Sequence, residues 1–177
     1  MQTLNNKKTA VLLTNGFEEI EFTKPKEALE QAGAQVEVIA PEKKIKAWHM
    51  KNWGSEYEAT LLLDDAEPKN YDALMLPGGV MNPDKLRQNK KAVEFVRYFM
   101  KENKPVAAIC HAPQMLIETG TINGRKLTSY PSLQTDLVNA GANWVNEEVV
   151  VDNRLVTSRS PQDLDAFNKE MIEVFSK

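Results

Sequence analysis

The stretch that decides the fold is PVAAICHAP, residues 105–113. Its apolar first half predicts a buried strand, and residues 111–117 beyond it predict the start of a helix. A strand that turns sharply into a helix holds one side chain up at the turn. Here that side chain belongs to Cys110, the only cysteine of the chain. Ala108 and Ala112, two residues to either side, are small enough for such a turn.

Two interpretations of Cys110 stay open on this pattern. A thiol near the positive end of a helix dipole is shifted toward thiolate, the nucleophilic form. Free cysteines are also among the most buried residues, and many are inert. His111 follows directly, and a neutral imidazole at a helix start is suited to accept the thiol proton. Its alternative is a structural histidine whose hydrogen bonds are satisfied at the helix start.

The rest of the chain alternates strand and helix patterns. Apolar runs predict buried strands, and longer segments with helical periodicity and capping signals predict helices. Residues 42–70 are less regular and predict an excursion with two short strands, 45–48 and 57–63. This alternation predicts an α/β fold, a mostly parallel sheet with helices on both faces. The strands are expected at 9–14, 35–40, 71–76 and 105–109, the helices at 22–33, 89–103, 132–140 and 161–175, and a hairpin at 149–157.

Length and composition limit the class of protein. The 177 residues predict a single domain over 9–177, preceded by a polar extension over 1–8. A net charge of −3 gives no basic footprint for nucleic acid, and no apolar run is long enough for a membrane span. One cysteine and two histidines disfavour a metal site, and no phosphate-binding glycine motif indicates a nucleotide cofactor. We therefore expect a cytoplasmic protein without cofactor or metal.

Three loops leave the carboxyl ends of predicted parallel strands, where such sheets bind ligands. They are residues 15–21, 77–84 and 110–111. In the first, Glu18 and Glu19 are typical solvated acids of a helix's first turn. Glu21 lies three residues beyond Glu18 and is expected to face the loop edge, where burial beside a thiolate raises its pKa.

The second loop carries Gly78 and Gly79, which predict a tight turn and also allow backbone N–H groups to approach an oxyanion. Asp84, in the same loop, is the best acidic candidate to orient the His111 imidazole. His49, between Trp48 and Met50, is interpreted as a surface or interface residue.

Together these segments resemble the PfpI family, which includes an intracellular protease, bacterial general stress proteins and the parkinsonism-associated deglycase. The similarity is carried by LPGG at 76–79, VAAICHAP at 106–113, TSYP at 128–131 and NAGANW at 139–144, and it extends from Thr9 to Phe175. It implies a flavodoxin-like, three-layer sandwich of the class I glutamine amidotransferase type.

The resemblance also implies roles for individual residues. Cys110 becomes the nucleophile and Glu21 the carboxyl that contacts it, while Gly79 and the backbone of His111 form an oxyanion pocket. In the protease-like branch an acid from a neighbouring subunit orients the histidine; Asp84 occupies that region, in a loop one residue longer. Ala112 stands where many members have glycine.

The function expected from this resemblance is a stress-response cysteine hydrolase. Its substrates are expected to be glycated or methylglyoxal-modified peptides and small dicarbonyl adducts, and the protein a homodimer or homohexamer. Two alternatives are an intracellular cysteine peptidase and a non-catalytic oxidative-stress sensor or chaperone that oxidises Cys110. A synthetase-linked glutaminase is disfavoured, because that triad places its histidine far downstream and no histidine follows His111.

Overall fold

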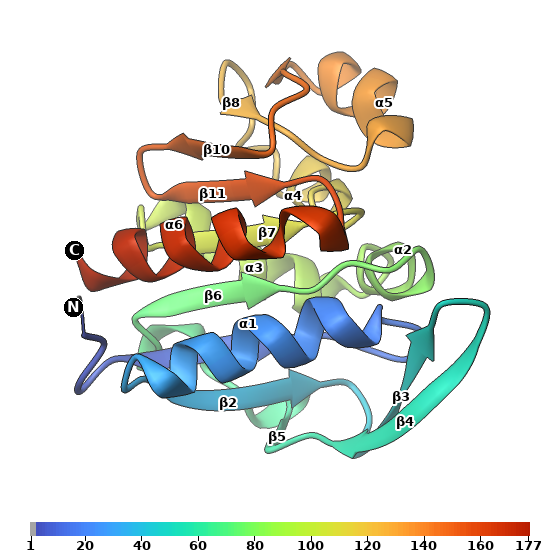
Figure 1. Ribbon diagram of the computed structural model, residues 1–177, viewed down its shortest axis with the longest axis vertical. Helices are drawn as coiled ribbons and strands as arrows, with labels where there is room; N and C mark the ends of the chain where they lie inside the picture. Colours follow the sequence, from blue (N-terminus) through green and yellow to red (C-terminus); the bar gives the residue numbers. More distant parts are fainter. Residues whose placement is uncertain (1–2) are drawn as a thin grey trace.

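A seven-stranded sheet forms the middle layer of the protein (Figure 1). The computed structural model describes residues 3–177. The strands of this sheet are β1 (Lys8–Leu12), β2 (Gln35–Ala40), β5 (Leu61–Leu62), β6 (Ala73–Leu76), β7 (Val106–Ile109), β10 (Val149–Asp152) and β11 (Leu155–Ser158). Their order in space is β10-β11-β7-β6-β1-β2-β5, and all pairs except β10–β11 are parallel. The predicted mostly parallel sheet and its C-terminal hairpin are confirmed.

Helices cover both faces of the sheet (Figure 1). Helices α1 (Glu19–Gln31) and α6 (Leu164–Ser176) pack on one face, and α3 (Lys90–Lys101) and α4 (Gln114–Thr119) on the other. Each face has its own apolar cluster, with Phe22 and Phe167 in the first and Phe99 and Leu116 in the second. The predicted three-layer α/β sandwich is therefore confirmed. The shorter helices are α2 (Met81–Leu86), α5 (Gln134–Asn139) and the 3₁₀ turns η1 (Leu63–Asp65), η2 (Pro68–Asn70), η3 (Pro131–Leu133) and η4 (Pro161–Asp163).

Helix α3 shows how sequence dictates these elements. The Asn89 side chain accepts hydrogen bonds from the Lys91 and Ala92 N–H groups at 3.0 and 3.2 Å, which caps the first turn. Val96 and Phe99, three residues apart, are buried on one face. Helix α1 starts earlier than predicted, at Glu19 instead of Phe22. That earlier start places Glu21 within the helix.

The excursion between β2 and β6 is a separate antiparallel hairpin of β3 (Lys44–His49) and β4 (Asn52–Glu58). The predicted strand at 45–48 is confirmed. The one at 57–63 is wrong, because β4 ends at Glu58 and β5 joins the main sheet. The hairpin projects beyond the carboxyl ends of the parallel strands (Figure 1). A hydrogen bond of 2.7 Å from the Trp48 N–H to the Phe17 carbonyl ties it to the loop after β1.

The N-terminal segment from residue 3 and the C-terminal end of α6 lie on the side of the sheet opposite this hairpin (Figure 1). Leu4, within the predicted polar extension, is fully buried, and its N–H donates to the Ala32 carbonyl at 2.7 Å. Residues 3–8 thus pack onto the domain, while Met1 and Gln2 lie outside the described residues. A second small sheet pairs β8 (Lys126–Leu127) with β9 (Asn143–Trp144) in parallel. No helix within residues 3–177 is long and apolar enough to cross a membrane.

Candidate active site

The three loops expected to converge do meet at one edge of the sheet. Strands β1, β6 and β7 are neighbours and run parallel, so their carboxyl ends lie side by side. The Glu18 N–H donates to the Gly78 carbonyl at 3.4 Å, and the Gly79 N–H donates to Glu21 Oε2 at 3.2 Å. These bonds join the first two loops, and Cys110 adjoins both.

Cys110 occupies the sharp turn that its flanking sequence predicts. Strand β7 ends at Ile109 and α4 begins at Gln114, and between them Cys110 has φ +62°. This left-handed conformation costs a non-glycine residue about 1 kcal/mol. It is held from both sides, because the Cys110 N–H donates to the Ser158 carbonyl at 3.0 Å and the Cys110 carbonyl accepts from the Tyr130 N–H at 2.8 Å. The sequence therefore maintains a strained turn at the single thiol.

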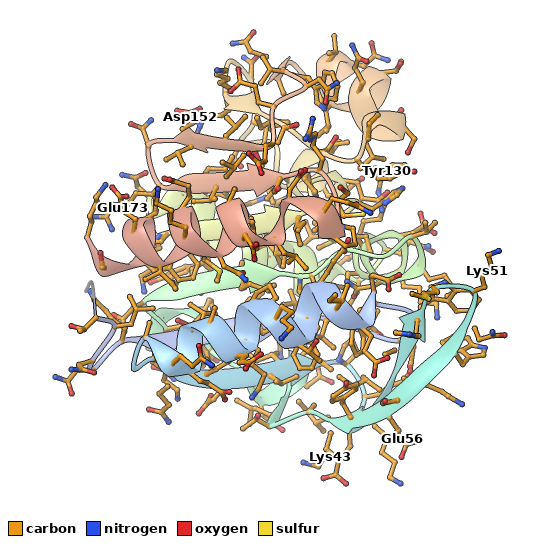
Figure 2. The ribbon with its side chains drawn as sticks, viewed as in Figure 1. Lys43, Lys51, Glu56, Tyr130, Asp152 and Glu173 are labelled. Atoms are coloured by element: carbon orange, nitrogen blue, oxygen red, sulfur yellow. The ribbon has the colours of Figure 1, made fainter. Side chains whose placement is uncertain are left out.

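The thiol borders a pocket of about 530 Å³. Cys110 is only 6% exposed, yet it lines this pocket and is not enclosed by aliphatic side chains alone. The β3–β4 hairpin supplies one wall and the segment after β8 another. Tyr130 lies at the same edge of the molecule as Lys51 at the hairpin tip (Figure 2). The lining residues are Gly16, Glu18, Glu21, Trp48, Met50, Gly79, Val80, Met81, Cys110, His111, Tyr130 and Pro161.

His111 is placed to exchange a proton with the thiol. Its Nδ1 lies 3.2 Å from Cys110 Sγ, within reach for a sulfur hydrogen bond. The imidazole stacks on the Tyr130 ring, with centroids 4.6 Å apart, and its Nε2 lies 3.4 Å from Ser132 Oγ. Burial lowers the pKa of His111, which keeps the ring neutral and able to accept a proton.

Asp84 does not orient this imidazole within the chain. It lies on α2 and is exposed, and in the described part of the chain His111 Nε2 meets Ser132 instead of an acid. Helix α2 begins at Met81, which turns Asp84 outward. The expected contact is therefore wrong for a single subunit, and a contact with a second subunit stays a prediction. Tyr130 and Ser132 were not predicted as site residues, because only tertiary folding brings them beside His111.

Glu21 is fully buried beside the thiol, as expected. Burial raises its pKa to about 8, and the hydrogen bonds from Cys110 and Gly79 offset only part of that effect. In the described residues, Oε1 is buried without a hydrogen-bond partner of ordinary geometry. A carboxyl in this setting is mostly protonated at neutral pH. Its O–H is then available to the sulfur.

The thiol itself departs from the sequence-based expectation. Burial raises the pKa of Cys110, and a negative charge on Glu21 raises it further. These effects act against the predicted shift toward thiolate, and α4, which begins four residues beyond Cys110 and has only six residues, does not outweigh them. The backbone N–H groups of Gly79 and His111 oppose the rise. The Gly79 N–H also donates to Glu21 Oε2 at 3.2 Å, so the use of these two amides as an oxyanion pocket stays a prediction.

The predicted small residues fit tightly around the nucleophile. A Cβ on Gly78 would lie 2.3 Å from Glu21 Oε2 and 2.7 Å from the Cys110 Cβ. Gly79 has φ +81°, a conformation that favours glycine. Ala112 is 1% exposed, and its N–H donates to the Ile109 carbonyl at 3.0 Å. All three lie at the turn as predicted, and Gly78 adjoins both titratable groups.

Asn82 is a further buried polar residue that the sequence did not single out. Its Nδ2 donates to the Pro77 and Gly78 carbonyls at 2.8 and 3.2 Å, and its Oδ1 accepts from the Thr14 N–H at 2.7 Å. At 1% exposure, these bonds are shielded from water. Asn82 thus joins the end of β1 to the turn that carries Gly79.

Asn82→Leu is expected to lower the free energy of unfolding by about 3 kcal/mol, because it leaves the N–H of Thr14 and two carbonyls unpaired in the interior. Urea denaturation measures this loss. Asn52→Leu, at an exposed position of β4, is the control and should change stability by less than about 0.5 kcal/mol. A loss below about 1 kcal/mol for Asn82→Leu would contradict this role.

The raised pKa of Glu21 predicts a pH-dependent stability. Because the folded state holds this proton more tightly, stability is highest below the unfolded pKa of 4.5 and falls as pH rises toward about 8. We expect wild type to lose a few kcal/mol relative to Glu21→Gln between about pH 5 and pH 8. Urea denaturation of both proteins at the two pH values gives this difference. Glu27→Gln, exposed on α1, is the control, and parallel curves for wild type and Glu21→Gln would refute the shift.

Within residues 3–177, no group of three or more His, Cys, Asp or Glu side chains is placed to hold a metal ion. The groups that adjoin the sulfur are the side chains of Glu21 and His111 and the amides of Gly79 and His111.

A family model described as DJ-1/PfpI matches residues 7–174. The chain belongs to the DJ-1/PfpI family. This DJ-1/PfpI chain is 44% identical over 172 residues to general stress protein 18 of Bacillus subtilis, covering 97% of the chain and 99% of the relative. It is 43% identical over 171 residues to a second Bacillus subtilis protein, named "Putative cysteine protease YraA", covering 96% and 98%.

Solved structures agree with this DJ-1/PfpI assignment. Drosophila melanogaster DJ-1beta matches with a TM-score of 0.84 and 30% identity, over 97% of this chain and 91% of that one. A two-domain Anabaena variabilis protein, with DJ-1/ThiJ/PfpI-like and ferritin-like domains, matches with a TM-score of 0.89 and 37% identity, over 95% of this chain and 48% of that one. The family and fold predicted from the sequence are thus confirmed.

Proposed function

We propose that this DJ-1/PfpI protein is a cytoplasmic, cysteine-dependent hydrolase of thiols, amines and peptides modified by methylglyoxal or related dicarbonyls. The observation that carries the proposal is the geometry at Cys110. The thiol sits on a left-handed turn, 3.2 Å from His111 Nδ1, against a buried carboxyl and near the backbone amides of Gly79 and His111. This arrangement supplies a nucleophile, a base and an oxyanion pocket.

The chemistry begins with loss of the Cys110 proton to His111. With Glu21 protonated, no like charge opposes the thiolate, and the carboxyl O–H can donate to it. The sulfur then bonds to the carbon of the adduct that is attached to the thiol or amine of the substrate, here called the carrier. The bond from that carbon to the carrier breaks. The carrier thiol or amine takes the proton from His111 and leaves.

The dicarbonyl fragment remains on the sulfur as a hemithioacetal. A proton moves from its carbinol carbon to the neighbouring carbonyl carbon, and the carbinol hydroxyl proton moves to the carbonyl oxygen. The first carbon is thereby oxidised and the second reduced, which gives a thioester. One water hydrolyses the thioester to a hydroxy acid and restores the thiol. The net reaction consumes the adduct and one water and releases the carrier and the hydroxy acid, with no external oxidant or reductant.

The size and walls of the pocket favour small adducts over long peptides. A volume of about 530 Å³ suits a small molecule or a modified side chain. The hairpin residues Trp48 and Met50 border it on one side and Tyr130 on another. An amide substrate would also require protonation of a poor leaving group. One relative is named a putative cysteine protease, so peptide cleavage is the alternative activity that an experiment must distinguish from adduct removal.

The test compares wild type with Cys110→Ser on a methylglyoxal-treated peptide and on a fluorogenic peptide. Release of free amine or thiol together with hydroxy acid, only with wild type, is the expected result. Cleavage of the fluorogenic peptide without adduct removal would replace the proposal with a peptidase. Equal adduct removal by Cys110→Ser would reject the nucleophile.

A second candidate, oxidation sensing, is favoured by the protonated carboxyl beside the thiol. Two equivalents of hydrogen peroxide would oxidise Cys110 through sulfenic to sulfinic acid, releasing one water each time. The sulfinate would accept the Glu21 hydrogen bond. Intact mass should show a gain of two oxygens that stops there in wild type and continues to three in Glu21→Leu. Indistinguishable oxidation of the two proteins would dismiss this role.

For assembly we propose a homodimer or homohexamer, with Asp84 on the exposed side of α2 available to a second copy. Light scattering measures the mass in solution, and a monomer at micromolar concentration would reject the assembly.

A further inference from the structure

The pocket beside Cys110 has an unbalanced charge. Its lining contains the carboxyl groups of Glu18 and Glu21 but no lysine or arginine. Glu21 is mostly neutral at neutral pH, and the pKa of His111 is lowered, so both contribute little charge. Glu18 therefore supplies a negative charge that no resident lysine or arginine in the lining offsets.

Glu18 is held at the pocket wall by backbone contacts. It precedes α1 with φ −68° and ψ 119°, and it forms an isolated parallel bridge with Trp48 of the hairpin. Partial burial raises the pKa of the Glu18 carboxyl, and the backbone N–H of Met50 opposes that rise. Within residues 3–177, Glu18 forms no ion pair with a lysine or arginine.

The carboxylate of the neighbouring Glu19, unlike that of Glu18, has side-chain partners on the hairpin. Its carboxylate accepts from the Tyr57 hydroxyl at 2.8 Å and the Ser55 N–H at 3.2 Å, and it pairs with His49 Nδ1 at 3.3 Å. Glu19 is thereby committed to holding the hairpin. His49, which also acts on Glu18, is engaged by this pair. Glu18 is the carboxylate left to face the pocket.

The other walls suit an organic cation. The lining includes the aromatic residues Trp48 and Tyr130, the latter stacked by His111 on one face, and the thioether residues Met50 and Met81. Aromatic rings attract ammonium and guanidinium groups, and a carboxylate in a partly dry site strengthens that attraction. An anionic carrier would be repelled at the same place.

We propose that Glu18, with Trp48 and Tyr130, forms a cation-binding subsite, so that the preferred substrates of Cys110 carry an ammonium or guanidinium group beside the reacting carbon. This rests on the proposed function for the reaction, although the subsite itself depends only on charge and geometry. A guanidinium suits it best, because it keeps its charge when it carries a dicarbonyl and can bond a carboxylate through two N–H groups.

The subsite can be tested without turnover, because Cys110 is the only thiol. Two ethyl methanethiosulfonates, one ending in trimethylammonium and one in sulfonate, transfer groups of equal chain length to the sulfur. In wild type the ratio of the cationic to the anionic rate constant is expected to exceed that of Glu18→Gln by about tenfold or more. Glu27→Gln removes a charge elsewhere on α1 and should keep the wild-type ratio. Equal ratios for wild type and Glu18→Gln would overturn the subsite.

Turnover then separates this proposal from the proposed function. The substrates are methylglyoxal hemithioacetals of thiocholine, 2-mercaptoethanol and 2-mercaptoethanesulfonate, which share a two-carbon chain and end in a cationic, a neutral and an anionic group. The expected order of kcat/KM is cationic, neutral, anionic, and Glu18→Gln should reduce the ratio of the cationic to the neutral value about tenfold. A charge-dependent labelling ratio without turnover of any adduct would reject the hydrolase and leave the subsite standing. Turnover in which the three values do not depend on Glu18 would reject the subsite alone.

Discussion

Cys110→Ser is expected to lower kcat/KM on a methylglyoxal-modified thiol or peptide by at least about 10³-fold. Serine keeps the size of the side chain and the hydrogen bonds of the turn, so folding is preserved. Its hydroxyl is a much weaker acid than a thiol, and His111, with a lowered pKa, is too weak a base to remove its proton. Steady-state assays with wild type and variant at equal concentration measure the loss. A reduction below about tenfold would show that the sulfur does not carry the reaction.

The strain at Cys110 gives this prediction a structural control. With φ at +62°, the backbone there suits glycine better than alanine. Cys110→Gly should therefore be more stable to urea than Cys110→Ala by about 1 kcal/mol, although both are inactive. If Cys110→Gly were less stable than Cys110→Ala, the strained turn would be absent, because that is the usual order at a residue with negative φ.

Gly78→Ala is expected to lower kcat/KM by about 10²-fold or more and the free energy of unfolding by about 3 kcal/mol. The added methyl group would lie 2.3 Å from Glu21 Oε2 and 2.7 Å from both the Cys110 Cβ and the Ile109 carbonyl oxygen. The Cys110 Cβ and the Ile109 carbonyl oxygen cannot move without the backbone. Relief of the steric clash therefore requires displacement of Cys110 or of the buried Glu21 carboxyl. A displacement of about 1 Å at a reacting group is enough for such a loss.

Gly124→Ala is the matched control for Gly78→Ala. Gly124 has φ +75°, but nothing lies within 4 Å of the position that an added methyl group would occupy, so only the backbone conformation is penalised. We expect a stability loss of about 1 kcal/mol and unchanged kcat/KM. Near-wild-type activity in Gly78→Ala would mean that the contacts around Glu21 and Cys110 are looser than described.

The fold could be predicted from the sequence because its signals are local. Continuous apolar runs identified β1 and β7, and apolar periodicity identified α3. The hairpin of β3 and β4 was less certain, because its exposed face is polar and two-residue strands such as β5 carry no periodicity of their own. Element ends such as the start of α1 depended on packing against the hairpin, which no short window of sequence contains.

The proximity of Cys110, His111 and Glu21 could also be predicted from the sequence, since strand-loop-helix order brings the carboxyl ends of parallel strands together. Their protonation was decided by the tertiary structure. Local sequence indicated a thiol of lowered pKa, whereas burial and the nearby Glu21 raise it. The partner of His111 Nε2, which is Ser132 and not an acid, also depends on residues distant in sequence. The same is true of the Glu18 charge at the pocket wall, which no lysine or arginine of the lining offsets. Desolvation and charge–charge interaction act through space, so the chain alone determined which groups are available, and only their three-dimensional packing decided their charge and partners.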